Sequence, residues 1–263
     1  MMYIHVSARN LKDMNHSNRR HARTHLGKFL SAIVAVEAGR LFRLYRSVKG
    51  NKEYWHQRAN APIREGDFVY LAIGDSVANG IGASSPQKGY VGLIAQHIHE
   101  TTSRAVHVVN VSVTGATAAD VIRDQLPQIK KLSPDLVTLD VGANDVNEGM
   151  PEDIFMLRFT TILDALPAHK TIVANLPNFK RGPQQSTLTR LNDAMHEQIV
   201  AHHFTMALVF EITSATVRDV RTYAADFFHP SDKGHRNWFR AFEPHVDSLL
   251  TSMTSEKVPL IEP

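Results

Sequence analysis

The chain has 263 residues, of which 43% are hydrophobic and 21% are charged, and these proportions are typical of an ordinary globular protein. This length suffices for one sizeable domain, or for one domain with an appendage. The absence of cysteine from the sequence excludes disulfides and thiolate metal sites and leaves the redox compartment open. No apolar stretch approaches the roughly 20 residues that a membrane-spanning helix requires.

The net charge of +3 conceals an asymmetry along the chain. Residues 1–66 hold thirteen Lys and Arg against four Asp and Glu, so the remainder of the chain is mildly acidic. An acidic body argues against a nucleic-acid-binding surface, because such surfaces need positive charge. Any anionic partner is therefore expected near the N-terminus.

Residues 1–65 are predicted to form a basic arm with one amphipathic helix. Apolar side chains recur at helical spacing within residues 26–49, and four basic side chains follow another side of this helix, Arg40, Arg43, Arg46 and Lys49. The helix either packs on the body or on a second copy, or makes peripheral contact with an anionic membrane. A weak signal peptide, with its basic region at residues 19–28, is a third interpretation. We expect a cytoplasmic protein, with membrane association or export as the alternatives.

The sequence Asn60-Ala61-Pro62 breaks any helix and marks a boundary near residue 65. Over residues 66–263, short apolar runs alternate with helical stretches. The predicted strands are 68–73, 106–111, 136–141, 171–174 and 207–210. The predicted helices are 90–99, 118–132 with a break at Pro127, 151–166, 184–203 and 230–252. This alternation predicts a parallel sheet covered by helices on both faces.

Polar residues follow the ends of these strands, where chemistry gathers in an open parallel sheet. Ser76 comes two residues after the first strand stops at Gly74, but a serine needs a base to become a good nucleophile. His229, in the loop before the last helix, can supply that base. Asp226, three residues earlier, can hold the other imidazole nitrogen and so select its tautomer. Pro230, expected at a first helical position, restricts the backbone beside the histidine.

An attacked carbonyl also needs donors for its developing negative charge. We expect three of them: the Ser76 amide at a helix N-terminus, the Gly115 amide after the second strand, and the Asn144 carboxamide after the third.

Each of these residues, taken alone, has a simpler explanation. Ser76 could only cap a helix, and Gly115 could only allow a bend. Asn144-Asp145 could be an ordinary turn pair, and Asp145 is expected to be structural.

Taken together, these residues resemble the SGNH hydrolase family, also called GDSL esterases and lipases. The resemblance covers residues 67 to about 250 and rests on four blocks in the family's order, Gly74-Asp75-Ser76, Gly115, Gly142-Ala143-Asn144-Asp145 and Asp226-x-x-His229. Four ordered blocks are far more specific than a lone Gly-Asp-Ser. Val77 stands where the family often has leucine, and the N-terminal arm has no counterpart in the family core.

The resemblance implies a flavodoxin-like α/β fold, in which a five-stranded parallel sheet lies between two layers of helices in a three-layer α/β/α arrangement. It makes Ser76 the nucleophile, His229 the base and Asp226 its partner, with Gly115 and Asn144 as oxyanion donors. It calls for no cofactor and no metal. The expected substrate is a small-molecule or lipid ester. The alternatives are a thioesterase, a lysophospholipase, a carbohydrate deacetylase or a catalytically silent membrane-associated binding protein.

A metal site is the remaining interpretation of the histidine loop, with His229 and His235 as ligands beside Asp226 and Asp232. We consider it weak, because His235 falls inside the predicted last helix and no third imidazole is placed nearby. The oligomeric state is left open by the sequence.

Overall fold

A computed structural model describes residues 39, 44, 47–129, 132–178 and 185–255. The chain divides into two compact units, Met1–Arg43 and Leu44–Pro263, and the description below concerns the second. Most of the amphipathic helix predicted over residues 26–49 lies outside the described residues, so its membrane contact stays a prediction, as does the boundary near residue 65. No helix among the residues described is both long and apolar enough to cross a membrane.

Five parallel strands form one sheet in the order β2-β1-β3-β4-β5. The strands are β1 (Phe68–Gly74), β2 (Val106–Asn110), β3 (Leu136–Asp140), β4 (Thr171–Ala174) and β5 (Thr205–Ala207). This is the flavodoxin-like order. Successive strands are added on one side of β1 and then on the other, so the strand order reverses between β1 and β3. The predicted fold class is confirmed, and the crevice between the ends of β1 and β3 is the expected place for a site.

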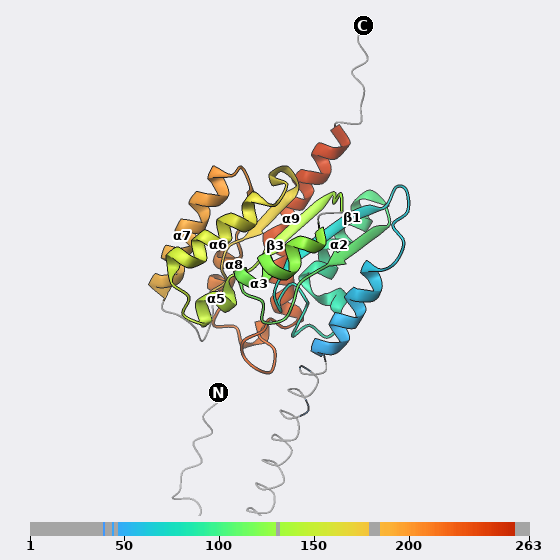
Figure 1. Ribbon diagram of the computed structural model, residues 1–263. Coiled ribbons are helices and arrows are strands. Elements are labelled where there is room, and N and C mark those ends of the chain that lie inside the picture. The colour runs from blue at the N-terminus through green and yellow to red at the C-terminus, as the bar shows by residue number, and fades with distance from the viewer. Residues whose placement is uncertain (1–38, 40–43, 45–46, 130–131, 179–184, 256–263) are drawn as a thin grey trace, which may run out of the picture. The chain divides into compact units, whose positions relative to one another are not determined.

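Helices cover both faces of the sheet (Figure 1). One layer packs on Leu71 and Ile73 of β1 and consists of α3 (Ala118–Asp120), α4 (Leu126–Ile129), α6 (Glu152–Asp164) and α7 (Gln185–Ala201). The other packs on Phe68 and Tyr70 and consists of a helix over residues 47–59, α2 (Tyr90–Thr102) and α9 (Asp232–Ser255). Successive strand side chains point to opposite faces, so an apolar strand supplies both cores at once.

The helix over residues 47–59 ends at Asn60-Ala61-Pro62, as the sequence predicts. Its Trp55 is only 2% exposed and belongs to the core beneath α2 and α9. Arg58 donates from Nη2 to the carbonyl of Val106 on β2 at 3.1 Å. Because β2 is an edge strand, this bond occupies one of its unpaired backbone groups.

The prediction of a fifth strand is confirmed, but its predicted bounds, residues 207–210, are wrong. β5 ends at Ala207, and Val209 begins a helix, α8 (Val209–Thr216), in which Thr213 Oγ1 donates to the Val209 carbonyl at 2.7 Å. A short apolar run has the same composition in a buried strand and in a buried helix, so its periodicity could not separate the two.

Two helix boundaries also differ from prediction. The stretch before Pro127 does not break but winds as a π-helix, η2 (Val121–Gln125), and continues into α4. The last helix begins at Asp232, so Pro230 lies outside it and forms an isolated antiparallel bridge with Tyr223. The remaining short helices are η1 (Pro86–Lys88), α5 (Ala143–Asn147), η3 (Ala168–Lys170) and η4 (Val220–Thr222).

Candidate active site

Ser76 sits in a tight turn immediately after β1. The strand must end in glycine because a Cβ on Gly74 would lie 2.3 Å from the carbonyl oxygen of Asp140 on β3. Two backbone hydrogen bonds then reverse the chain, from Gly80 to the Val77 carbonyl and from Ile81 to the Ser76 carbonyl, both at 2.9 Å. The chain after Ser76 is therefore a series of turns and not the predicted helix N-terminus, so no helix dipole supports its amide.

The three residues predicted for nucleophilic catalysis meet in one line of hydrogen bonds. Ser76 Oγ lies 3.0 Å from Nε2 of His229, and Nδ1 of His229 lies 2.6 Å from Oδ2 of Asp226. Because a carboxylate accepts, Nδ1 carries the proton and Nε2 is free to accept from the serine hydroxyl. The arrangement selects the imidazole tautomer that can serve as a base.

Asp226 is held in its charged form. Partial burial by itself raises the pKa of Asp226, but hydrogen bonds from the His229 ring and the Phe228 amide outweigh it and leave the pKa below its usual value. Oδ1 accepts from the amides of Phe228 and His229, each at 3.0 Å. The carboxylate therefore fixes both the ring and the backbone of the histidine.

The loop that carries Asp226 and His229 is closed at its base. The Ala224 amide donates to the His229 carbonyl at 2.7 Å, and the Ser231 amide donates to the Thr222 carbonyl at 2.9 Å. Phe227, at the tip, has a φ of +56°, a left-handed conformation that is uncommon for a non-glycine residue. A short loop pinned in this way can hold a histidine at one place above the sheet.

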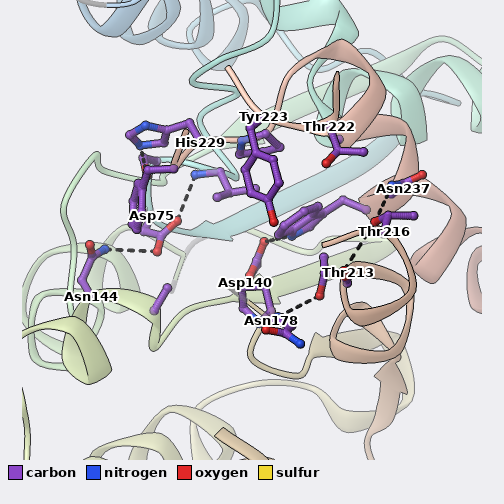
Figure 2. Close-up of a pocket in the computed structure, with 18 residues that line it drawn as sticks. Asp75, Asp140, Asn144, Asn178, Thr213, Thr216, Thr222, Tyr223, His229 and Asn237 are labelled. Carbon is purple, nitrogen blue, oxygen red and sulfur yellow. Dashed lines mark hydrogen bonds between the residues drawn. The ribbon is translucent and has the colours of Figure 1, made fainter. Parts of the chain in front are cut away.

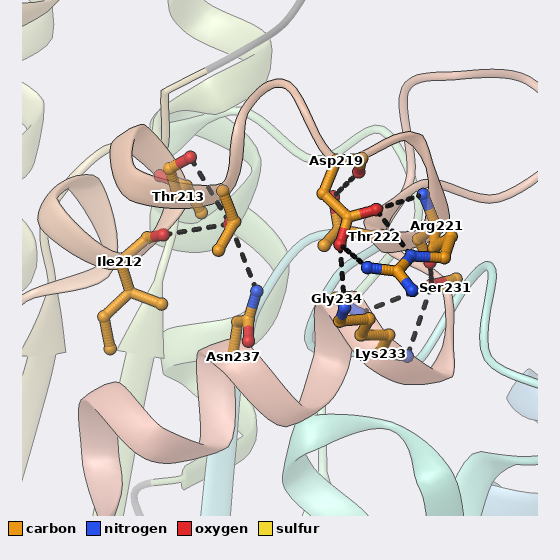
Figure 3. Close-up of polar contacts among 10 residues, drawn as sticks. Ile212, Thr213, Asp219, Arg221, Thr222, Ser231, Lys233, Gly234 and Asn237 are labelled. Atoms are coloured by element: carbon orange, nitrogen blue, oxygen red, sulfur yellow. Dashed lines mark hydrogen bonds and ion pairs between the residues drawn. The ribbon is translucent and has the colours of Figure 1, made fainter.

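Asp219 ties this loop to α9 (Figure 3). Its carboxylate accepts from the Arg221 guanidinium at 2.9 Å and from Lys233 Nζ at 2.7 Å. These two cations hold the pKa of Asp219 well below its usual range. Asp219 at the base of the histidine loop therefore stays charged to a lower pH than an ordinary carboxylate.

Asn144 lies beside Ser76 and bridges two neighbouring loops. Its Nδ2 donates to Oδ2 of Asp75 at 3.1 Å (Figure 2) and to the carbonyl of Ala116 at 2.9 Å, so both amide hydrogens are engaged. Asp75 Oδ1 also accepts from the Val77 amide at 2.9 Å. Asp75 therefore connects the turn that carries Ser76 to Asn144, a role that the Gly-Asp-Ser block did not reveal.

Gly115, the other predicted oxyanion donor, lies in an exposed turn after β2 and has a φ of +83°. It precedes Ala116, the residue that accepts from Asn144, so these two loops are joined at the sheet edge. The structure does not place Gly115 among the residues that line the pocket around Ser76. Asp145 is fully buried and accepts from the Ala118 amide at 2.9 Å, in agreement with a structural role.

A small pocket opens from Ser76 and His229 across the ends of β3 and β4. Its enclosed volume is about 30 Å³, room for roughly two water molecules. Tyr223 and Trp238 form aromatic walls, and the far end is polar, with side chains from Asn178, Thr213, Thr216, Thr222 and Asn237 (Figure 2).

A second buried carboxyl group, Asp140, also lines this pocket. Its Oδ2 accepts from Trp238 Nε1 at 3.1 Å. Burial, together with the charge of nearby Asp75, raises the pKa of Asp140 to about 8. Burial also raises the pKa of Asp75, to about 6, although the Val77 amide and His229 oppose that rise. Burial therefore favours the protonated form of Asp140 more strongly than that of Asp75.

His235 does not join a metal site. It is fully buried in α9, where Nε2 lies 3.0 Å from the carbonyl oxygen of Ile81 and the Tyr90 amide donates to Nδ1 at 3.4 Å. Within the described part of the chain, no group of three His, Asp or Glu side chains is arranged to hold a metal ion. The ring instead connects α9 to the loop after Ser76.

Gln125 is a further residue that sequence reasoning missed. It is fully buried in the π-helix η2, where Nε2 donates to the Gly74 carbonyl at 2.8 Å and Oε1 accepts from the Gly74 amide at 3.0 Å. This side chain satisfies both backbone groups of the residue that ends β1. A polar residue within an apolar helical stretch is the one signal that could have drawn attention to it.

Solved structures share this fold. The chain resembles TesA (19% identity, TM-score 0.58, covering 69% of this chain and 99% of that chain). It also resembles the psychrotrophic esterase EstA from Pseudoalteromonas sp. (18% identity, TM-score 0.56, 70% and 98%). A third is Axe2, an acetylxylan esterase from Geobacillus stearothermophilus (20% identity, TM-score 0.54, 68% and 94%). At these identities the likeness concerns the fold.

Sequence comparison is more specific than this structural likeness. No curated protein matches the chain. The model of the GDSL-like Lipase/Acylhydrolase family, however, matches residues 72–236, which is more than half of the chain and contains every predicted site residue. The protein therefore belongs to the GDSL-like lipase/acylhydrolase family and is a carboxylic ester hydrolase.

Proposed function

We propose that Ser76, His229 and Asp226 hydrolyse a carboxylic ester through an acyl-enzyme. The observation that carries this proposal is the unbroken line from the Ser76 hydroxyl through both imidazole nitrogens to a charged carboxylate, with separations of 3.0 and 2.6 Å. A serine hydroxyl is a weak nucleophile by itself, and an oriented imidazole within hydrogen-bond reach is what activates it.

The reaction proceeds in two halves. Ser76 Oγ attacks the ester carbonyl carbon as Nε2 of His229 takes the hydroxyl proton, and the intermediate collapses when Nε2 returns that proton to the departing alcohol. Water then enters, loses a proton to the same nitrogen and attacks the acyl group, so that the acid leaves and Ser76 regains its proton. Asp226 stabilises the imidazolium in both halves without taking its proton.

The negative charge that develops on the carbonyl oxygen needs hydrogen-bond donors in the transition state. We assign this role to the Ser76 amide, the Asn144 carboxamide and the Gly115 amide. Both Asn144 hydrogens are engaged at rest, so an oxyanion has to compete for one of them with Asp75 or with the Ala116 carbonyl. It competes better than the neutral ester oxygen of the bound substrate, because an oxyanion is the stronger acceptor.

The pocket favours an ester with a short acyl group. A cavity volume of about 30 Å³ holds two or three heavy atoms, so an extended alkyl chain would have to continue outside the pocket. Its polar far end also disfavours a long apolar chain, because amide and hydroxyl groups covered by methylene groups lose their remaining contact with water. A second candidate, deacetylation of a sugar, is favoured by the two aromatic walls beside the polar groups Asn178 and Asn237, and Axe2 of similar fold is an acetylxylan esterase.

The test compares wild-type protein with Ser76→Ala on p-nitrophenyl acetate, butyrate and longer p-nitrophenyl esters. We expect Ser76→Ala to lower kcat by more than about 10³-fold, and the wild type to lose about tenfold in kcat/KM between butyrate and the longer esters. Ser252→Ala, on an exposed turn of α9, is the matched control and should retain full activity. A fluorophosphonate probe should label the wild type at Ser76. Unchanged turnover in Ser76→Ala would refute the proposal.

A further inference from the structure

The helix over residues 47–59 reaches the turn that carries Ser76. Two of its side chains, Asn51 and Trp55, are buried to 4% and 2% exposure and lie one helical turn apart on the same face. Asn51 Nδ2 and Trp55 Nε1 both donate to the carbonyl oxygen of Asn79, each at 3.0 Å. This helix precedes residues 72–236, the part of the chain that the family model matches.

Asn79, the residue that receives these bonds, connects the loops of the active site. It follows Ser76 by three residues, and its amide donates back to the Asp75 carbonyl at 3.1 Å. Its side-chain Nδ2 donates to the carbonyl of Ser112 at 3.3 Å, in the loop that leads to Gly115. A shift of Asn79 therefore moves both the nucleophile turn and the neighbouring loop.

The other carbonyl groups of this turn are satisfied by residues inside the family domain. Ser76 and Val77 accept from amides within the turn, and Ala78 accepts from Asn110 Nδ2 of β2 at 2.8 Å. The Asn79 carbonyl differs, because both of its hydrogen bonds within the described residues come from the N-terminal helix. The turn after Ser76 is thus completed by a segment outside the family core.

We propose that the helix over residues 47–59 is part of the catalytic scaffold, with Asn51 and Trp55 as positioning residues that hold the turn of Ser76 through the carbonyl of Asn79. The inference rests on the proposed role of Ser76. Neither side chain lines the pocket, so they act on the geometry of the nucleophile and not on substrate contact.

The physical reason is the cost of a buried carbonyl without a donor. If one donor is lost, the other still satisfies the Asn79 oxygen, but if both are lost the oxygen is left unpaired in the core. The turn then relaxes toward another donor and carries Ser76 away from His229. A displacement on the order of 1 Å lowers a reaction rate by about 10²-fold.

The experiment is a double-mutant cycle with Asn51→Leu and Trp55→Phe, which remove the donors and keep apolar bulk in the core. The control is Arg58→Met, which removes a bond from the same helix to the Val106 carbonyl without reaching the turn of Ser76. We expect each single variant to lower kcat about threefold, the double variant to lower it about 10²-fold, and KM to change less than twofold. The rate of fluorophosphonate labelling at Ser76 should fall in parallel with kcat.

The outcomes separate a positioning role from a merely structural one. Unfolding free energies of all variants are measured in urea, and activity is assayed at a temperature at which every variant is folded. If the double variant keeps kcat and labelling rate within twofold of wild type, or if Arg58→Met loses as much, the inference is overturned while the proposed function stands. If Ser76→Ala retains wild-type turnover, the proposed function fails first and the inference falls with it.

Discussion

The buried imidazole of His235 makes stability depend on pH in a direction that the structure determines. Nε2 faces the Ile81 carbonyl, which can only accept, so Nε2 carries the ring proton and Nδ1 accepts from the Tyr90 amide. The ring is therefore neutral in the folded protein. Burial lowers the pKa of His235 to about 4, although the Ile81 carbonyl and Asp232 act in the opposite direction.

In the unfolded chain the same imidazole titrates near its ordinary pKa of about 6.5. Between that value and the folded pKa of about 4, the unfolded chain binds more protons than the folded protein. The contribution of His235 to stability is therefore fully present above about pH 6.5 and is lost progressively as the pH falls. From about pH 7.5 to about pH 5 the loss amounts to ~2 kcal/mol, a substantial part of the 5–15 kcal/mol that stabilises a typical domain.

The assay uses His235→Gln, whose amide can still donate to the Ile81 carbonyl but does not titrate. Urea unfolding of both proteins is followed by tryptophan fluorescence at several pH values and constant ionic strength. Asp75 and Asp140 have raised pKa values, so their contributions to the unfolding free energy fall as the pH rises. Both residues are present in both proteins, so these contributions cancel when the two unfolding free energies are subtracted. We expect the stability of the wild type relative to the variant to fall by about 2 kcal/mol between pH 7.5 and pH 5. A difference that stays constant with pH would refute this reasoning.

Two further substitutions test the site and its support. Asp226→Asn should lower kcat by about 10²–10⁴-fold with little change in KM, because an amide no longer selects the His229 tautomer. Pre-steady-state hydrolysis of p-nitrophenyl acetate measures this loss. A loss of kcat below threefold would contradict the proposed role of Asp226. Gln125→Met should lower the unfolding free energy by about 2–4 kcal/mol, because the amide and carbonyl of Gly74 lose their side-chain partner inside the core. Equal urea midpoints for Gln125→Met and wild type would show that this clamp adds no stability.

One part of the site is held by residues close to it in the sequence and the other part by distant residues, so substitutions are expected to affect the two parts differently. Asp226 and His229 are three residues apart, and a loop with its own hydrogen bonds holds them. Ser76 depends on distant residues, because the turn around it is fixed by Gln125, Asn51 and Trp55 through the backbone of Gly74 and Asn79. Substitutions in this support are therefore expected to act on kcat although they touch no substrate.

The α/β class, the positions of four of the five strands and the order of the motif blocks follow from the amino-acid order alone. Buried parallel strands are continuous apolar runs, and the glycines and polar residues that end them stand out against such runs. The spacing of Asp226 and His229 also suffices to predict their contact, because only two residues lie between them. Where the apolar run was short and no glycine ended it, as at residues 207–210, the same reasoning took a helix for a strand.

Which buried polar groups meet depends on how the elements pack in three dimensions. Asn144 donates to Asp75 across 69 positions of the chain, Gln125 clamps Gly74 across 51, and Trp55 reaches Asn79 across 24. Each contact joins a side chain to a partner on another element, and the partner depends on helix docking and strand register. Local periodicity indicates which face of an element is buried, but it does not indicate which residues of other elements that face contacts. For this reason the proposed catalytic residues could be identified from the sequence, whereas the residues proposed to position them could not.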